Sequence, residues 1–339
     1  MEHFEHPCGR SRILVGPAAG ALARVLPAEC RTVVVTDAGV VRAHPELTAP
    51  YATILVGRGE RCKTFAAVER VCRELLAADA DRATFVLGVG GGIVTDIAGF
   101  AASVYMRGVR FGFVSTTLLG QVDAAVGGKN GVNVDGYKNI MGLFRQPEFV
   151  VCDPTLTGTL PDREFRAGLA EALKAGIVGD AALFARIERA SYGALRGDAE
   201  LLSRVVEGAV GVKCSIVEAD ECEAGVRRKL NLGHTLAHAI EKCSDRMNHG
   251  EAVAVGLALV ARASVRLGLL CEAECRRIER VLRGLGFELD PPVPVERLLR
   301  EVVHDKKREG GVLHAVLPEA VGSCTVRPMS VAEFAALFA

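Results

Sequence analysis

The chain has 339 residues, of which 50% are hydrophobic and 24% charged, and this length favours two domains over a single core. Basic and acidic residues both number 41, so the formal net charge is zero and no global field favours nucleic acid or an anionic membrane as a partner. No apolar run is long enough to span a membrane, and Pro17, Gly20 and Arg24 interrupt the N-terminal apolar stretch, which argues against a signal peptide. Eleven cysteines without a CxxC pair indicate reduced thiols, and we expect a cytoplasmic protein.

The first half of the chain alternates short β-branched runs with helical stretches. The predicted strands are residues 31–37, 52–57, 83–89, 111–116 and 149–153. Their near-continuous apolar character is typical of strands buried on both faces, which favours a parallel sheet with helical crossovers. From about residue 162 the spacing becomes helical, with little strand signal until 313–326. We therefore predict an α/β fold with a Rossmann-like parallel-sheet domain over residues 1–153 and a mainly α-helical domain over residues 154–339.

Two of the predicted strand ends carry polar or glycine-rich sequence. Asp37 closes the first strong strand, where its carboxylate could bind a ribose diol or, equally well, cap the next helix. Glu60 and Lys63 follow the next strand and could reach the adenosine end of a nucleotide. The glycines of GVGGGIVTD lie between a strand and a helix, where bare backbone suits a diphosphate, although a merely tight turn explains them as well. They are Gly88, Gly90, Gly91 and Gly92.

The segment 115–139 concentrates glycine, lysine and asparagine. Its polar members are Lys129, Asn130, Asn133, Lys138 and Asn139. Such a loop suits phosphate or polyol hydroxyl groups, and the alternative interpretation is a solvated hairpin.

Histidines and one acidic residue in the second half indicate a metal site. Glu171 lies in the apolar stretch AGLAEALKAG, and Lys174 one turn later could supply its charge partner, unless the two form a surface ion pair. His234 and His238 form an HxxxH pair, which offers two ligands to a metal but is often a pair of capping or core histidines. His249 precedes the next helical run, where a turn can fold it back beside the preceding helix. A catalytic zinc needs three protein ligands, and Glu171 is the best acidic candidate.

Several motifs together resemble the 3-dehydroquinate synthase family. This family belongs to the sugar-phosphate cyclases, which share their fold with glycerol dehydrogenases and iron-type alcohol dehydrogenases. The resemblance covers roughly residues 30–330. Its carriers are GVGGGIVTDIAGF, YMRGVRF, STTLLGQVDAAVGGK, KNIMGLFRQP, TLPDREFRAGLAEALK, RRKLNLGHTLAHAIE, NHGEAVAVG and HDKK.

The resemblance implies roles for individual residues. Glu171, His234 and His249 would bind one divalent metal ion, zinc or alternatively cobalt, while His238 would face the substrate phosphate instead of the metal. NAD would be held by Asp37, Glu60, Lys63, Gly91, Gly92, Asp96, Thr116, Thr117, Lys129 and Lys138. The substrate would be contacted by Asp123, Lys129, Asn139, Lys174, Lys213, Arg227, Asn231, His238 and Lys307. Arg107 would reach the phosphate in the partner subunit's site, which implies a homodimer.

The resemblance also implies a reaction. The substrate would be 3-deoxy-D-arabino-heptulosonate 7-phosphate, converted to 3-dehydroquinate and phosphate in the shikimate pathway of aromatic amino-acid biosynthesis. The expected course is transient oxidation by NAD, phosphate elimination, re-reduction, ring opening and aldol cyclisation. Lys213 and Arg227 favour a substrate with a carboxylate. The alternatives are another sugar-phosphate cyclase, a metal- and NAD-dependent polyol dehydrogenase, and a non-catalytic homologue. The chain departs from the usual family pattern at Asn130, Tyr137 and Ala237.

Overall fold

The computed structural model describes residues 4–307 and 312–338 of the chain. These fall into two compact units. The sheet unit comprises residues 1–161 and 202–221, and the helical unit comprises residues 162–201 and 222–339. The predicted α/β class is confirmed by the parallel sheet of the first unit and the helices of the second.

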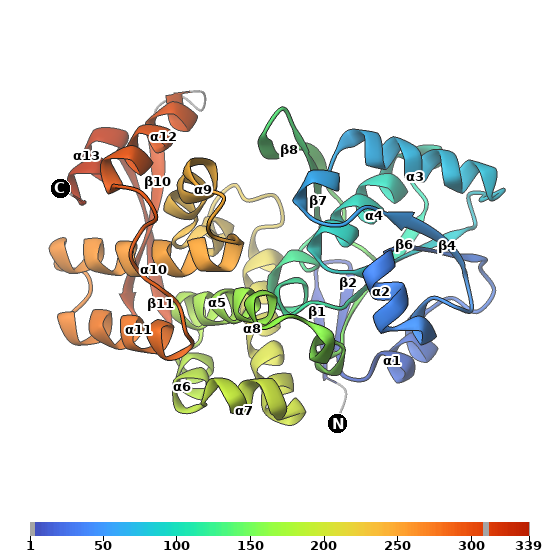
Figure 1. Cartoon of the computed structure of the whole chain (residues 1–339), viewed down its shortest axis with the longest axis horizontal. Helices are drawn as coiled ribbons and strands as arrows, with labels where there is room; N and C mark the ends of the chain where they lie inside the picture. The colour runs from blue at the N-terminus through green and yellow to red at the C-terminus, as the bar shows by residue number, and fades with distance from the viewer. Residues whose placement is uncertain (1–3, 308–311, 339) are drawn as a thin grey trace. The chain divides into compact units, whose positions relative to one another are not determined.

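A seven-stranded sheet forms the centre of the sheet unit (Figure 1). Its strands are β1 (Phe4–Cys8), β2 (Ser11–Val15), β3 (Thr32–Asp37), β4 (Ala52–Val56), β5 (Phe85–Gly90), β6 (Arg110–Ser115) and β9 (Phe149–Cys152). The order is β1-β2-β9-β6-β5-β3-β4, with β1 antiparallel to β2 and all other neighbours parallel. The five predicted strands are confirmed as β3, β4, β5, β6 and β9. The hairpin of β1 and β2 was not predicted.

Helices cover the sheet and bury the apolar strands. They are α1 (Ala18–Val25), α2 (Ala38–Ala43), α3 (Phe65–Ala77) and α4 (Gly92–Val104), with short helices at Pro45–Leu47, Glu60–Cys62, Tyr105–Arg107, Gly120–Ala124 and Pro154–Thr159. Helix α4 packs on β5 and β6, and eight of its 13 residues are buried. Every residue of β5 is buried, which explains why this strand reads as a continuous apolar run instead of an alternating one.

The second part of the glycine- and asparagine-rich segment 115–139 forms a β-hairpin, which was the alternative to a ligand-binding loop. Strands β7 (Lys129–Val134) and β8 (Tyr137–Phe144) pair antiparallel around a two-residue turn of Asp135 and Gly136, both with positive φ. A turn with two positive φ angles matches the twist of a hairpin, and Asp-Gly is a favoured sequence for it.

Helices dominate the second unit. They are α5 (Asp162–Gly179), α6 (Ala181–Arg189), α7 (Tyr192–Gly197), α9 (His234–Cys243), α10 (His249–Arg266), α11 (Glu272–Gly284), α12 (Val295–Lys307) and α13 (Val331–Ala336), with a short helix at Val226–Asn231. Strands β10 (Val312–Ala320) and β11 (Ser323–Ser330) form an antiparallel hairpin. Helix α10 is the buried centre, and it packs against α5, α9 and α11 (Figure 1).

Most of helix α8 (Ala199–Ala219) belongs to a different unit from the one predicted. The prediction placed everything after residue 153 in the second domain, whereas residues 154–161 and 202–221 group with the sheet unit. The reason lies in side-chain contacts with the N-terminal strand β1, which was not predicted. The Arg204 guanidinium stacks over the Phe4 ring at 4.8 Å, and a Cβ at Gly211 would lie 3.7 Å from the His6 ring. Within the described residues, no helix is both long and apolar enough to cross a membrane.

Candidate nucleotide and metal sites

The carboxyl ends of β3 and β5 meet at the point where the strand order of the sheet reverses. From β3 the chain continues to β4 on one side and then returns to β5 on the other side. In open α/β sheets, ligands bind in the crevice at such a switch point. Asp37 closes β3 there, and Gly91 and Gly92 follow β5.

The glycines after β5 are required by close packing. A Cβ on Gly91 would lie 2.7 Å from Cγ2 of Thr117, and one on Gly92 would lie 2.8 Å from Cβ of Ala124. Gly91 is the N-cap of α4, and the backbone N–H of Thr116 donates to the Gly90 carbonyl. The structure therefore brings the predicted glycines and threonines together at the N-terminus of α4. A helix N-terminus lined by glycine offers backbone N–H groups to a diphosphate.

Lys63 is a buried lysine at the centre of a polar network beside this helix. It forms an ion pair with Asp96 of α4 and donates from Nζ to Oδ1 of Asn139 at 2.5 Å. Burial raises the pKa of Asp96 to about 6, against the opposing attraction of Lys63. Asn139 lies on β8, so the network fastens the hairpin to the segment after β4.

Glu60 extends the same network from the other side. Its Oε1 accepts from Nδ2 of Asn133 at 2.7 Å, and Oδ1 of Asn133 accepts from the backbone N–H of Asn139 at 2.9 Å. The structure thus connects the predicted nucleotide residues Glu60, Lys63 and Asp96 with the predicted substrate residue Asn139.

Asp37 is the N-cap of α2, which is one of the two roles that the sequence indicates for it. Its Oδ1 accepts from the backbone N–H groups of Gly39 at 2.6 Å and Val40 at 3.2 Å, at the start of α2. The cap fixes the direction of the carboxylate at the end of β3. Arg58 lies 3.6 Å from the same oxygen.

Five further predicted residues lie elsewhere in the sheet unit. Lys213 of α8 forms an ion pair with Asp123 and donates to its backbone carbonyl at 2.6 Å, a contact that no local sequence signal indicates. Lys129 and Lys138 are exposed on the hairpin. Arg107 is exposed, with φ of 68°, after Met106 with φ of 48°. A non-glycine residue with positive φ stores backbone strain of order 1–3 kcal/mol, which often accompanies function.

The helical unit brings Glu171 into a buried position on α5. The side chain of Glu171 is fully buried and that of Lys174 is 3% exposed, with Nζ of Lys174 2.6 Å from Oε2 of Glu171. The interpretation as a surface ion pair is therefore wrong. A buried carboxylate needs charge partners because water cannot solvate it, and Lys174 supplies one.

Glycines beside the two histidines allow their helices to approach closely. A Cβ on Gly250 would lie 2.2 Å from Cα of Ala167, one turn before Glu171 on α5. A Cβ on Gly256 of α10 would lie 2.2 Å from the carbonyl oxygen of Gly233, which precedes α9. These backbone contacts bring the first residues of α9 and α10 beside the middle of α5.

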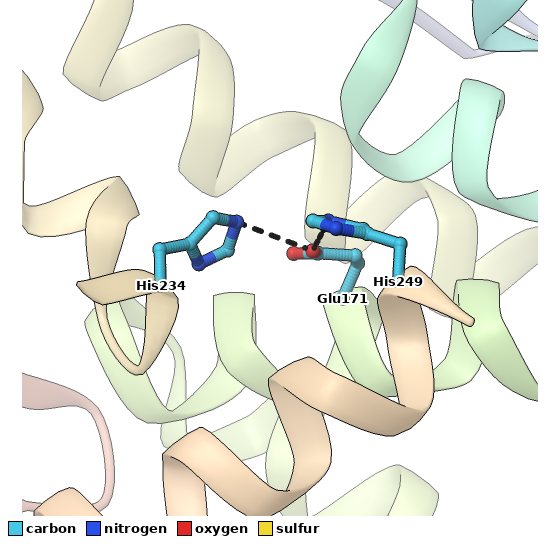
Figure 2. Close-up of side chains that lie close together, drawn as sticks. All are labelled: Glu171, His234 and His249. Atoms are coloured by element: carbon cyan, nitrogen blue, oxygen red, sulfur yellow. Dashed lines mark hydrogen bonds and ion pairs between the residues drawn. The ribbon is translucent and has the colours of Figure 1, made fainter. Parts of the chain in front are cut away.

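Glu171, His234 and His249 converge as a result. Nε2 of His249 lies 3.1 Å and Nε2 of His234 lies 3.5 Å from the same oxygen, Oε1 of Glu171. Figure 2 shows the two imidazole rings directed at the carboxylate. One donor atom from each residue lies within 4.8 Å of the others. The HxxxH spacing alone would have selected His238, whose side chain is exposed and which is not in this group.

The electrostatics of the two histidines differ. Burial, with help from the positive charge of Lys174, lowers the pKa of His234 to about 3, so this ring is neutral. Burial would also lower the pKa of His249, but hydrogen bonds with Glu171 and Glu241 outweigh it and raise the pKa to about 10. The field of the two carboxylates therefore favours a positive charge at His249.

This donor set fits a divalent metal ion. Two imidazole nitrogens and one carboxylate oxygen are a frequent ligand set of catalytic zinc, and neutral imidazole is the form that binds. Nδ1 of His234 lies 3.1 Å from the Leu232 carbonyl, which leaves Nε2 for a metal. Nδ1 of His249 lies 3.3 Å from Oε1 of Glu241. Glu241 was missed from the sequence, although it lies two helical turns after His234 on one face of α9.

The remaining predicted substrate residues belong to the helical unit. Arg227 is 2% exposed, and Asn231 donates from Nδ2 to Oε1 of Glu223 at 2.5 Å; both lie on the short helix before α9. The rings of His238 and His234 are 5.6 Å apart. Lys307 ends α12, and its side chain lies outside the described part of the chain.

The fold is that of the sugar-phosphate cyclases. A solved structure described as ValA, a 2-epi-5-epi-valiolone synthase from Streptomyces hygroscopicus subsp. jinggangensis 5008 with NAD+ and Zn2+ bound, superposes with a TM-score of 0.86. It is 30% identical in sequence, and the match covers 96% of this chain and 94% of that one. A 2-deoxy-scyllo-inosose synthase complexed with carbaglucose-6-phosphate, NAD+ and Co2+ also gives a TM-score of 0.86, at 21% identity and 99% coverage of both chains.

The sequence comparisons are more specific. The 3-dehydroquinate synthase N-terminal family matches residues 53–167, and the C-terminal family matches residues 168–308. A 3-dehydroquinate synthase from Halorhodospira halophila is 43% identical over 314 residues, which are 91% of this chain and 88% of the relative. One from Bradyrhizobium sp. (strain BTAi1 / ATCC BAA-1182) is 41% identical over 318 residues, 87% and 83% of the two chains. The chain belongs to the 3-dehydroquinate synthase family, and the expectation of a lyase is confirmed.

Proposed function

We propose that the protein is a 3-dehydroquinate synthase that converts 3-deoxy-D-arabino-heptulosonate 7-phosphate to 3-dehydroquinate and phosphate. The observation that carries the proposal is the convergence of Glu171, His234 and His249 in a chain whose sheet unit has a glycine-lined helix N-terminus at its switch point. In the proposed sequence, a substrate hydroxyl is oxidised, phosphate is eliminated, and the hydride is returned before ring opening and aldol closure. No NADH accumulates.

Two cofactors fit these residues. NAD would lie at the carboxyl ends of β3 and β5, with its diphosphate at Gly91 and Gly92 and its nucleoside end near Asp37, Glu60 and Lys63. A zinc ion, or alternatively cobalt, would be held by Glu171, His234 and His249. When bound, NAD supplies a temporary hydride acceptor and the metal acidifies a substrate hydroxyl as a Lewis acid.

The surrounding charges suit a substrate with a carboxylate and a phosphate. We assign Lys213 and Arg227 to the carboxylate, because both are buried cations whose N–H groups can donate to carboxylate oxygens. His238 is assigned to the phosphate. Lys174 holds the Glu171 carboxylate in its direction through the 2.6 Å contact, and the same ammonium can donate to a substrate oxygen.

The proposal includes a homodimer. Arg107 is exposed and follows a strained backbone at Met106, so the short helix Tyr105–Arg107 presents the guanidinium outward from the sheet unit. An arginine in this position suits the phosphate bound by a second copy of the chain. An Arg107→Ala variant would then lose activity while a mixed dimer with a Lys174→Met variant recovers part of it.

A coupled assay tests the function. Purified protein is mixed with 3-deoxy-D-arabino-heptulosonate 7-phosphate, NAD and zinc, and phosphate release is followed together with absorbance of NADH. Stoichiometric phosphate without accumulated NADH supports the synthase. NADH formation from a polyol would instead identify a dehydrogenase.

A second substrate separates the synthase from related cyclases. A heptulose phosphate without a carboxylate should react poorly with the wild type if Lys213 and Arg227 bind that group. Lys213→Met should raise KM for the carboxylate substrate far more than for the neutral one. Faster turnover of the neutral sugar phosphate would assign the protein to another cyclase reaction.

A further inference from the structure

Glu241 lies against the outer nitrogen of His249. Its Oε1 is 3.3 Å from Nδ1 of His249, and its side chain is 6% exposed. The opposite nitrogen of the same ring, Nε2, lies 3.1 Å from Glu171. The imidazole is therefore held between two carboxylates, one on each ring nitrogen.

His234 has the same arrangement with a different acceptor. Its Nδ1 lies 3.1 Å from the backbone carbonyl of Leu232, while Nε2 faces Oε1 of Glu171. Both histidines thus present Nε2 to the convergence point and place Nδ1 against an oxygen. A carbonyl or carboxylate oxygen only accepts hydrogen bonds, so each ring must carry its proton on Nδ1 when Nε2 binds a metal.

The position of Glu241 on α9 connects the two rings. Glu241 follows His234 by two helical turns, so both residues occupy one face of the same helix. His249 begins the next helix, α10. The contact between Glu241 and His249 therefore fixes the direction of a ring on α10 from the helix that carries the other histidine.

We propose that Glu241 is a positioning residue that fixes the tautomer and ring orientation of His249 for metal binding. The inference deepens the proposed function, because it rests on Glu171, His234 and His249 as the ligand set. Carboxylates in this position raise the basicity of a metal-binding histidine, and their loss typically weakens metal affinity about 10–100-fold.

Metal affinity of purified variants tests the proposal without reference to turnover. Zinc and cobalt dissociation constants are measured by competition with a chromogenic chelator. Glu241→Ala should weaken binding about 10–100-fold. Glu241→Gln can still place an amide oxygen against Nδ1, so it should recover most of the affinity. Glu188→Ala is the matched control. Glu188 is a partly buried glutamate of the helical unit that pairs with Arg277, so its loss should leave metal affinity unchanged.

The visible absorption spectrum of the cobalt-loaded protein is the second readout. Glu241→Ala should change the spectrum because the orientation of one ligand changes, whereas Glu241→Gln should keep the wild-type spectrum. Unchanged affinity and spectrum in Glu241→Ala would overturn the proposal, as would a Glu241→Gln variant as weak as Glu241→Ala. If the alanine variant does not fold, Glu241→Leu replaces it in both measurements, because leucine is similar in size to glutamate and offers Nδ1 of His249 no acceptor.

Glu171→Gln and His249→Ala distinguish this inference from the proposed function. Loss of metal in these two variants, with wild-type affinity in Glu241→Ala, refutes only the positioning role. Retention of metal in Glu171→Gln and His249→Ala refutes the ligand set itself.

Discussion

The two units build their candidate sites from different materials. In the sheet unit, the proposed diphosphate position consists largely of backbone, with Gly91 and Gly92 at a helix N-terminus and threonines after β6, beside the Lys63–Asp96 ion pair. In the helical unit, the site consists of ionisable side chains on three helices, with Glu171 and His234 buried and His249 partly buried. Ligand binding by backbone groups should tolerate changes of nearby side chains but not a Cβ added to a glycine. A buried charge, in contrast, is stable only while its charged partner is present. We therefore expect different substitutions to disrupt the two sites.

The largest effect is expected for a metal ligand of the helical unit. Glu171→Gln removes a charge of the donor set and leaves Lys174 buried without its carboxylate partner. Lewis-acid assistance is worth several kcal/mol, so turnover should fall about 1,000-fold or more. Phosphate release and metal content measure the effect. Full activity with bound metal in this variant would remove Glu171 from the site.

Gly250→Ala tests whether helix packing controls the same site. The new Cβ would lie 2.2 Å from Cα of Ala167, so α10 must shift away from α5. We expect a loss of about 1–3 kcal/mol in the free energy of unfolding, together with weaker zinc binding. Urea denaturation and chelator competition measure the two. Gly284→Ala is the control, since no atom outside its chain neighbours and its own helix backbone lies within 4 Å of its added Cβ. A Gly250→Ala variant as stable as this control would contradict the packing argument.

Gly91→Ala applies the same test to the sheet unit. Its Cβ would lie 2.7 Å from Cγ2 of Thr117, which displaces the N-terminus of α4. NAD affinity should fall about 10-fold, which is 1.4 kcal/mol, while zinc affinity stays at the wild-type value. Calorimetric titration with each ligand checks this. A variant that loses zinc and keeps NAD would reverse the assignment of the two sites.

The last effect is a gradual pH dependence of stability in the sheet unit. Burial raises the pKa of Asp96 to about 6 in the folded chain, against about 3.9 when unfolded. Between these values the folded state binds more protons, so the free energy of unfolding falls as pH rises from about 4 to 6, by at most about 1.4 kcal/mol per pH unit. Asp96→Asn should remove this slope in urea denaturation. Parallel profiles of unfolding free energy against pH for the wild type and Asp96→Asn would contradict the assignment to Asp96.

Much of the sheet unit could be predicted because its signals are local. The buried strands read as apolar runs, and the glycines stand directly after one of them. The hairpin of β7 and β8 is one of the two interpretations that the sequence allows for this segment, and Asp135-Gly136 between two possible strands is its local signal. Strand β1 was missed because an edge strand buries only alternate residues, and Phe4–Cys8 includes a proline.

The helical site depended on information that no local pattern contains. From spacing alone, HxxxH favours His238 as the partner of His234. The residues also indicate His249 and Glu171 as candidates, but only the family resemblance excludes His238 from the ligand set. The structure shows why: the donors meet where glycines allow three helices to approach. The pairing of Asp123 with Lys213 is likewise invisible in the sequence, because the two residues are separated by the whole of α5, α6 and α7.

The contact of Gly256 with the Gly233 carbonyl has a consequence for the choice of ion. The spacing of the donor atoms is set by main-chain contacts between helices, not by long flexible side chains. Zinc and cobalt have similar radii and both accept two imidazoles and a carboxylate. We expect a larger ion such as cadmium to bind more weakly than zinc, because a wider spacing of the donors would work against the close contact of α9 with α10.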